Sequence, residues 1–152
     1  MERNVFISIR GMHQLQDGDG READVEMVSR GQYYKRNGKE YVSYEEQLDP
    51  EGDKTKAMVK VDGESVIVNH LGAFGAQMRF ELGKRSMMIY QTPFGVMEMG
   101  VTTQNMELDL QDHNWKIRIG YTLDVDNHYS GEHEVHIAVQ DSKGDPIIRL
   151  VN

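Results

Sequence analysis

Residues 115–125 read Trp-Lys-Ile-Arg-Ile-Gly-Tyr-Thr-Leu-Asp-Val. Apolar and aromatic residues occupy every odd position of this stretch, and polar residues or glycine occupy the even positions. Because the side chains of a β-strand alternate between its two faces, this pattern predicts a strand with one buried and one solvated face. At roughly 3.3 Å per residue the strand is ~35 Å long, which is more natural for a tilted barrel strand than for a small sandwich.

The rest of the chain repeats this alternation between frequent turn signals. Asn37-Gly38 and Asp62-Gly63, for example, supply the positive φ angles that short hairpin turns need. Alternating segments cover residues 5–9, 23–34, 42–48, 57–61, 66–70, 78–82, 87–92, 96–111, 115–125 and 135–139. We therefore expect an all-β fold: one domain over residues 1–152, built as an antiparallel up-and-down β-barrel of about 8–10 strands.

In residues 96–111 the alternation of apolar and polar residues changes its phase. The apolar residues stand at odd positions from Met97 to Val101 and at even positions from Met106 to Leu110. A strand cannot exchange its two faces without an extra residue. The sequence therefore predicts a β-bulge or a sharp bend between Gly100 and Asn105.

Composition excludes several classes of function. The formal net charge is -8, from 25 acidic and 17 basic residues, which disfavours binding to nucleic acids and to anionic membranes. The absence of cysteine excludes disulfides and thiol nucleophiles, and it fits a reducing cytosol. No apolar run reaches the length of a signal peptide or the roughly 18 residues of a membrane span. We expect a cytoplasmic protein.

No motif indicates catalysis or a metal site. The chain has no Gly-x-Ser-x-Gly elbow and no glycine-rich phosphate loop before a helix. His133 and His136 are three positions apart, an odd spacing, so on one strand they point to opposite faces and cannot chelate together. The acidic turns lack the glycine and glutamate of a calcium loop. We expect no catalytic residue, no cofactor and no metal.

Four short motifs in order resemble the YwiB-like family, a set of small uncharacterised bacterial proteins with lipocalin-like (calycin) barrels. They are Gly31-Gln32-Tyr33-Tyr34-Lys35, Tyr44-Glu45-Glu46, Tyr90-Gln91-Thr92-Pro93-Phe94-Gly95 and Tyr121-Thr122-Leu123. The resemblance extends over most of the chain and implies a lipocalin-like up-and-down barrel whose interior holds a small apolar molecule. It implies no reaction. Secreted lipocalins typically carry Gly-x-Trp near the first strand, whereas the only tryptophan here is Trp115, so lipocalin ligands and receptors do not carry over.

Seven residues in the inward phase are candidates for lining a ligand pocket. They are Tyr44, Glu46, His70, Met78, Phe80, Met99 and Tyr121. Glu46 shares the phase of Tyr44. If it is buried, its carboxylate needs a partner such as Arg79, Arg118 or a ligand; the alternative is a solvent-exposed position at the barrel mouth.

The methionines allow two interpretations. Met78, Met97 and Met99 all fall in apolar phases, where they line a pliable cavity or fill an ordinary core. Met87 and Met88 are adjacent and so point to both faces of one strand. One of that pair is therefore exposed or covered by a partner.

Two functional hypotheses remain open. In the first, the barrel is a non-enzymatic protein that binds a small, largely apolar ligand in its interior. In the second, large inward groups such as Trp115, Phe80 and Tyr121 fill the interior, because an eight-stranded barrel is only just wide enough for side chains. A filled barrel would act through its surface, as a protein-interaction module or as a homodimer.

Overall fold

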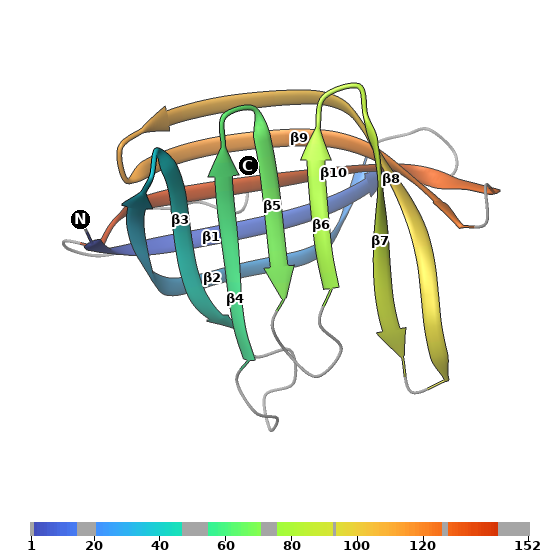
Figure 1. Ribbon diagram of the computed structural model, residues 1–152, viewed down its shortest axis with the longest axis horizontal. Helices are drawn as coiled ribbons and strands as arrows, with labels where there is room; N and C mark the ends of the chain where they lie inside the picture. The colour runs from blue at the N-terminus through green and yellow to red at the C-terminus, as the bar shows by residue number, and fades with distance from the viewer. Residues whose placement is uncertain are drawn as a thin grey trace.

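The computed structural model describes residues 2–14, 21–46, 55–70, 76–92, 94–125 and 128–142 (Figure 1). At strand positions 13, 14, 21–26, 46, 55, 70, 76, 90–92 and 130 it describes the backbone alone. The regular structure in these ranges is entirely β-strand. Within them, no helix is long and apolar enough to cross a membrane.

Ten strands form one antiparallel sheet that curls into a nearly closed barrel (Figure 1). They are β1 (Glu2–Gln14), β2 (Arg21–Arg36), β3 (Lys39–Glu46), β4 (Thr55–Asp62), β5 (Ser65–His70), β6 (Ala76–Glu81), β7 (Arg85–Thr92), β8 (Gly95–Gln111), β9 (Asn114–Val125) and β10 (His128–Asp141). Their order in the sheet is β6-β5-β4-β3-β2-β1-β10-β9-β8-β7. The predicted all-β antiparallel barrel is confirmed.

The barrel closes between the first and last strands and opens between two consecutive ones. β1 pairs with β10 over nine register positions, from Val5 opposite Asp141 to His13 opposite His133. β6 and β7 are the two ends of the sheet, although only a short turn separates them in the chain. They are joined by this turn, yet they are not hydrogen-bonded neighbours in the sheet (Figure 1).

The turn between β6 and β7 is held in two ways. The Gly83 N–H donates to the Thr103 carbonyl at 2.9 Å, and the Thr103 N–H donates to the Lys84 carbonyl at 3.2 Å, so the turn is anchored to β8. The Glu81 carboxylate lies 2.6 Å from the Arg79 guanidinium and 3.1 Å from the Lys84 ammonium. These two cations, Arg79 first, lower the pKa of Glu81 to about 2.

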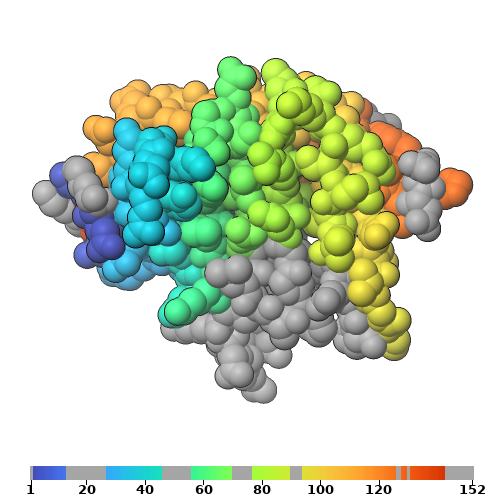
Figure 2. Space-filling view, viewed as in Figure 1, coloured from blue at the N-terminus to red at the C-terminus, as the bar shows by residue number. Residues whose placement is uncertain are grey.

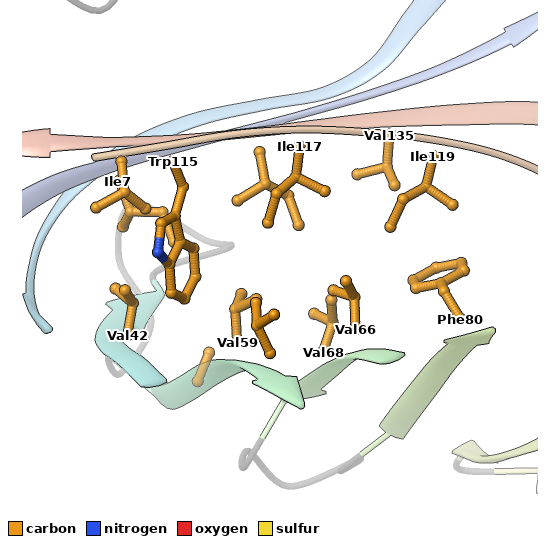
Figure 3. Packing of buried hydrophobic residues seen from close by; sticks show 14 of the residues in the cluster. Ile7, Val42, Val59, Val66, Val68, Phe80, Trp115, Ile117, Ile119 and Val135 are labelled. Carbon is orange, nitrogen blue, oxygen red and sulfur yellow. The ribbon is translucent and has the colours of Figure 1, made fainter. Parts of the chain in front are cut away.

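Burial follows the predicted alternation. On β9, Trp115, Ile117 and Ile119 are buried, whereas Lys116 and Arg118 between them are exposed. Figure 3 shows the result: side chains of β1, β9 and β10 face those of β3 to β6 across the interior. The core includes Ile7, Val42, Val59, Val66, Val68, Phe80, Trp115, Ile117, Ile119 and Val135.

The predicted irregularity in β8 is a β-bulge. The register with β9 shifts between Thr103 and Asn105. This extra residue lets both Val101 and Met106 contact the same core although their positions differ in parity. The predicted Asn-Gly turn is confirmed as well, since Asn37 and Gly38 have φ angles of 53° and 77°.

Candidate functional site

The structure describes the side chains of five of the seven residues predicted to line the interior. Tyr44 and Phe80 are buried in the core, and Met78, Met99 and Tyr121 are partly buried against it. The side chains of Glu46 and His70 lie outside the part that the structure describes. All five described side chains therefore belong to the interior face, as the alternation predicted.

These residues do not form one cluster. The Phe80 ring lies 5.1 Å from the Tyr121 ring, which in turn stacks on His133 at 5.4 Å. Tyr44, in contrast, is on β3, which is separated from β6 and Phe80 by β4 and β5 in the sheet. The interior thus offers a Phe80–Tyr121 cluster, with Tyr44 apart from it.

A buried hydroxyl lies beside the Phe80–Tyr121 cluster. Thr103 is opposite Tyr121 in the register of β8 and β9, and its side chain is 1% exposed. Among the described residues its Oγ1 has no hydrogen-bond partner. A buried polar group without a partner is uncommon, because it loses its bonds to water without replacement. It gives this end of the interior a buried hydroxyl, close to the stacked rings of Tyr121 and His133.

At the other end of the core, Tyr33 joins aromatic and charged groups. Its ring packs against Trp115 in a T-shape at 6.0 Å, and its hydroxyl donates to Glu40 Oε1 at 2.7 Å. His113 Nε2 lies 3.0 Å from Asp141 Oδ2, which also accepts from Arg3 at 3.3 Å. Burial, followed by the Glu40 carboxylate, raises the pKa of Tyr33 above its ordinary value of 10.0.

We expect Tyr33 to make stability fall in alkali. Its folded-state pKa is raised, so its contribution is fully present below pH 10 and is lost as the unfolded tyrosine ionises above that pH. The wild-type advantage over Tyr33→Phe should shrink by about 1.4 kcal/mol for each pH unit above 10. Urea unfolding of both proteins between pH 9 and 11 measures this difference. Parallel pH profiles would contradict the burial of an un-ionised Tyr33.

Two grooves lie on the outer face of the barrel. The first, about 870 Å³, crosses β1, β8, β9 and β10, and Ser8 and Ala138 are among its small lining residues. Its lining combines cations, such as Arg10 and Lys116, with the carboxylates of Glu107 and Asp109. The second, about 980 Å³, crosses β2, β3 and β4. The lining of the first groove has three arginine or lysine residues against two carboxylates, so its charge is mixed.

One outward side chain of β10 is a buried carboxylate. Glu134 is 5% exposed, and its Oε1 accepts from Arg118 Nε at 2.5 Å and lies 2.7 Å from His136 Nε2. His133 lies on the opposite face against Tyr121, as the odd spacing predicted. Among the described residues no three potential metal ligands lie together.

The exposed apolar side chains gather on one hairpin. We call β7, Phe94 and residues 95–99 of β8 together the arm; it projects below the barrel at the right of Figures 1 and 2. Of the eight exposed large hydrophobic residues among the described positions, five are on the arm: Met87, Ile89, Phe94, Val96 and Met97. Phe94 is fully exposed at its tip.

The arm is fixed at its base. Arg85 on β7 pairs with Asp124 on β9 through two hydrogen bonds of 2.6 and 3.0 Å, which cross over β8. Gly100 of β8 lies beneath this pair, where a Cβ would collide with both side chains. The missing side chain of Gly100 is therefore what lets the arm be tied to β9.

The position of the arm corrects one expectation and confirms another. Met97 has the apolar phase of Met99, yet it is 44% exposed, because the arm extends past the end of the barrel and Met97 has no core to face. The adjacent residues Met87 and Met88 were predicted to point to opposite faces of one strand, with one of them exposed or covered by a partner. Met87 is 51% exposed and Met88 is 8% exposed. The sequence signal for the arm was the presence of apolar residues in both phases of residues 87–89 and 96–99.

Known proteins resemble this chain over almost its whole length. The family model of a domain of unknown function (DUF1934) matches residues 7–137. The chain is 29% identical over 140 residues to the uncharacterized β-barrel protein YwiB of Bacillus subtilis (strain 168), covering 92% of this chain and 96% of YwiB. The crystal structure of the ywiB protein from Bacillus subtilis matches with a TM-score of 0.78 at 26% identity, over 93% of this chain and 94% of that one.

Proposed function

This chain belongs to the DUF1934 family of uncharacterised domains, and we propose that it is a non-enzymatic binding module that acts through its surface. One observation carries the proposal. Among the described residues, the large apolar side chains that remain exposed are concentrated on the arm, which carries five of the eight. Contiguous exposed apolar surface is costly in water, and in soluble proteins it marks sites of interaction.

The packing of the interior supports a surface function. Trp115 and Phe80, the largest fully buried side chains, are each 1% exposed, and both point into the barrel (Figure 3). Around them the inward faces are lined by valine and isoleucine. A ten-stranded barrel filled in this way gives a rigid support, and the arm extends from it with its base fixed by the Arg85–Asp124 pair.

The proposal predicts that a partner covers the methionines of the arm in the cell. Hydrogen peroxide should oxidise Met87 and Met97 quickly in dilute purified protein, because they are 51% and 44% exposed. In intact cells that produce the protein naturally, both rates should fall at least ~5-fold, since oxidation follows exposure. Tandem mass spectrometry of the arm peptide measures each position separately.

Met88 is the matched control for this measurement. It lies beside Met87 on the same strand but is only 8% exposed, so it should oxidise slowly in both samples. Equal rates at Met87 and Met97 in cells and in dilute solution would show that the arm is uncovered, and the proposal would then be wrong.

A second candidate function is the binding of a small, largely apolar ligand within the barrel. The buried Thr103 hydroxyl beside Tyr121 favours it, because such pockets combine apolar walls with a few polar groups. Met78 and Met99, which are only partly buried against the core, supply adaptable side chains on the interior face. Added mass in the native mass spectrum of protein purified from its own cells would favour this candidate, and a clean apo mass would count against it.

A further inference from the structure

We infer that the arm binds a second copy of this chain, through antiparallel pairing of β7 with β7 of the partner. This inference rests on the proposed surface function and names the partner of the same site. The resulting dimer has a two-fold axis, and each copy contributes the same strand to the contact.

β7 has an edge that can accept another strand. It pairs with β8 from Arg85 opposite Thr102 to Thr92 opposite Gly95. On its other side it is the end of the sheet, and no strand of the described residues pairs with it. The N–H and C=O groups of such an edge form a template for strand addition, which supplies main-chain hydrogen bonds.

The two free edges of the sheet differ in their protection. β6 has six residues, and it carries Arg79 and Glu81, which pair with each other at 2.6 Å. Charged side chains on a short edge strand oppose pairing with another chain. β7 has eight residues, and from Ser86 to Thr92 it has neither a charge nor a proline. Only the β7 edge is therefore left suited to a partner strand.

Charge favours a second copy at this place. The chain has a net charge of -8, so two copies repel each other over most approaches. Residues 86–97, which make up most of the arm, contain no charged side chain. Two arms can therefore meet without placing like charges against each other.

One register makes the contact self-complementary. If the two-fold axis passes at Met88, Met87 lies opposite the partner's Ile89, and Ile89 lies opposite the partner's Met87. Both side chains are about half exposed in the single chain, at 51% and 54%. Directly opposite apolar side chains stabilise a strand pair. In this register Arg85 lies opposite the partner's Gln91, which is uncharged.

The first test is the mass of the purified full-length chain in solution. Sedimentation equilibrium should show twice the chain mass at high concentration and the single mass on dilution. Ile89→Lys should raise the dimer dissociation constant at least ~10-fold, because it places an unpaired cation in an apolar contact. Val28→Lys is the matched control: Val28 is another exposed apolar strand residue, 42% exposed, but it lies on β2 and should leave the constant unchanged.

The second test examines the register, using the absence of native cysteine. A mixture of Met87→Cys and Ile89→Cys chains should form a disulfide-linked heterodimer on mild oxidation, because the two positions are directly opposite. Each variant alone should give at least ~5-fold less cross-linked product, since identical positions are then diagonal rather than opposite. Equal cross-linking of all three samples would contradict this register.

The outcomes separate this inference from the proposed function. A chain that stays monomeric at every concentration, or whose dimer is equally sensitive to Ile89→Lys and Val28→Lys, overturns the inference. If Met87 and Met97 are nevertheless protected in cells, the arm binds a different partner and the surface function stands. If the dimer forms as described, protection of Met87, which lies in the β7–β7 contact, should also appear in concentrated purified protein.

Discussion

Replacing Trp115 with alanine should lower the free energy of unfolding by about 3–5 kcal/mol, the range for removing a large aromatic side chain from a packed core. Trp115 is 1% exposed, its ring packs against Tyr33 at 6.0 Å, and its Nε1–H donates to the Asp112 carbonyl at 3.1 Å. The substitution removes all these contacts and leaves a cavity that the rigid strands around it cannot fill. Domains of this kind are stable by only about 5–15 kcal/mol, so the loss is a large part of the total.

Urea unfolding followed by circular dichroism measures this effect, since the variant lacks the only tryptophan and its fluorescence signal. Lys116→Ala is the matched control, because Lys116 is the next residue on β9 and points to the exposed face. We expect it to change stability by no more than about 0.5 kcal/mol. A loss below about 1 kcal/mol for Trp115→Ala would mean that the interior is not closed around this side chain.

Replacing Gly31 with alanine should cost about 1–3 kcal/mol, because the new methyl group overfills the space between β2 and β3. A Cβ at this position would lie 2.7 Å from the Ser43 backbone oxygen, 3.3 Å from Val42 Cγ1 and 3.4 Å from Tyr44 Cβ. A backbone oxygen held in a sheet cannot move as the end of a flexible side chain can. The two strands must separate, and their hydrogen bonds weaken.

Gly11→Ala is the control for this substitution. Gly11 lies on the neighbouring strand β1, a Cβ there would have no atom within 4 Å beyond its own chain neighbours, and the φ of Gly11 is not positive. There the methyl group should be neutral or should stabilise by up to about 1 kcal/mol, since it restricts the unfolded chain. Urea unfolding of the two variants gives the comparison. Equal stabilities would show that the close approach at Gly31 does not constrain the sheet.

Local sequence was enough to predict most of the architecture. The alternation in residues 115–119 predicted which side chains at the start of β9 are buried, because the period of a strand is two wherever the strand lies, whereas residues 121–125 are all partly buried. The change of phase after Val101 predicted the bulge before Asn105 for the same reason. Tyr44 and Phe80 were placed correctly in the interior by the parity of their positions.

The candidate sites could be predicted only in part. Parity assigned both Met97 and Met99 to the interior face. Only Met99 contacts the core, because the arm extends past the end of the barrel between these two residues. The close pair of Phe80 and Tyr121 joins β6 to β9, two strands that are distant both in sequence and in sheet order. No local pattern contains such a contact.

The sequence by itself determined the strands, their turns, the inward faces and the bulge, because each depends on the alternation of neighbouring residues and on backbone geometry at turns. Only the tertiary structure decided that β1 closes onto β10, that the open seam falls between β6 and β7, and that the arm projects with its apolar residues exposed. These features depend on how all ten strands curve and tilt together. The place where we propose that a partner binds therefore depends on the nearly closed barrel, whereas the residues proposed to bind it are already apolar in the sequence.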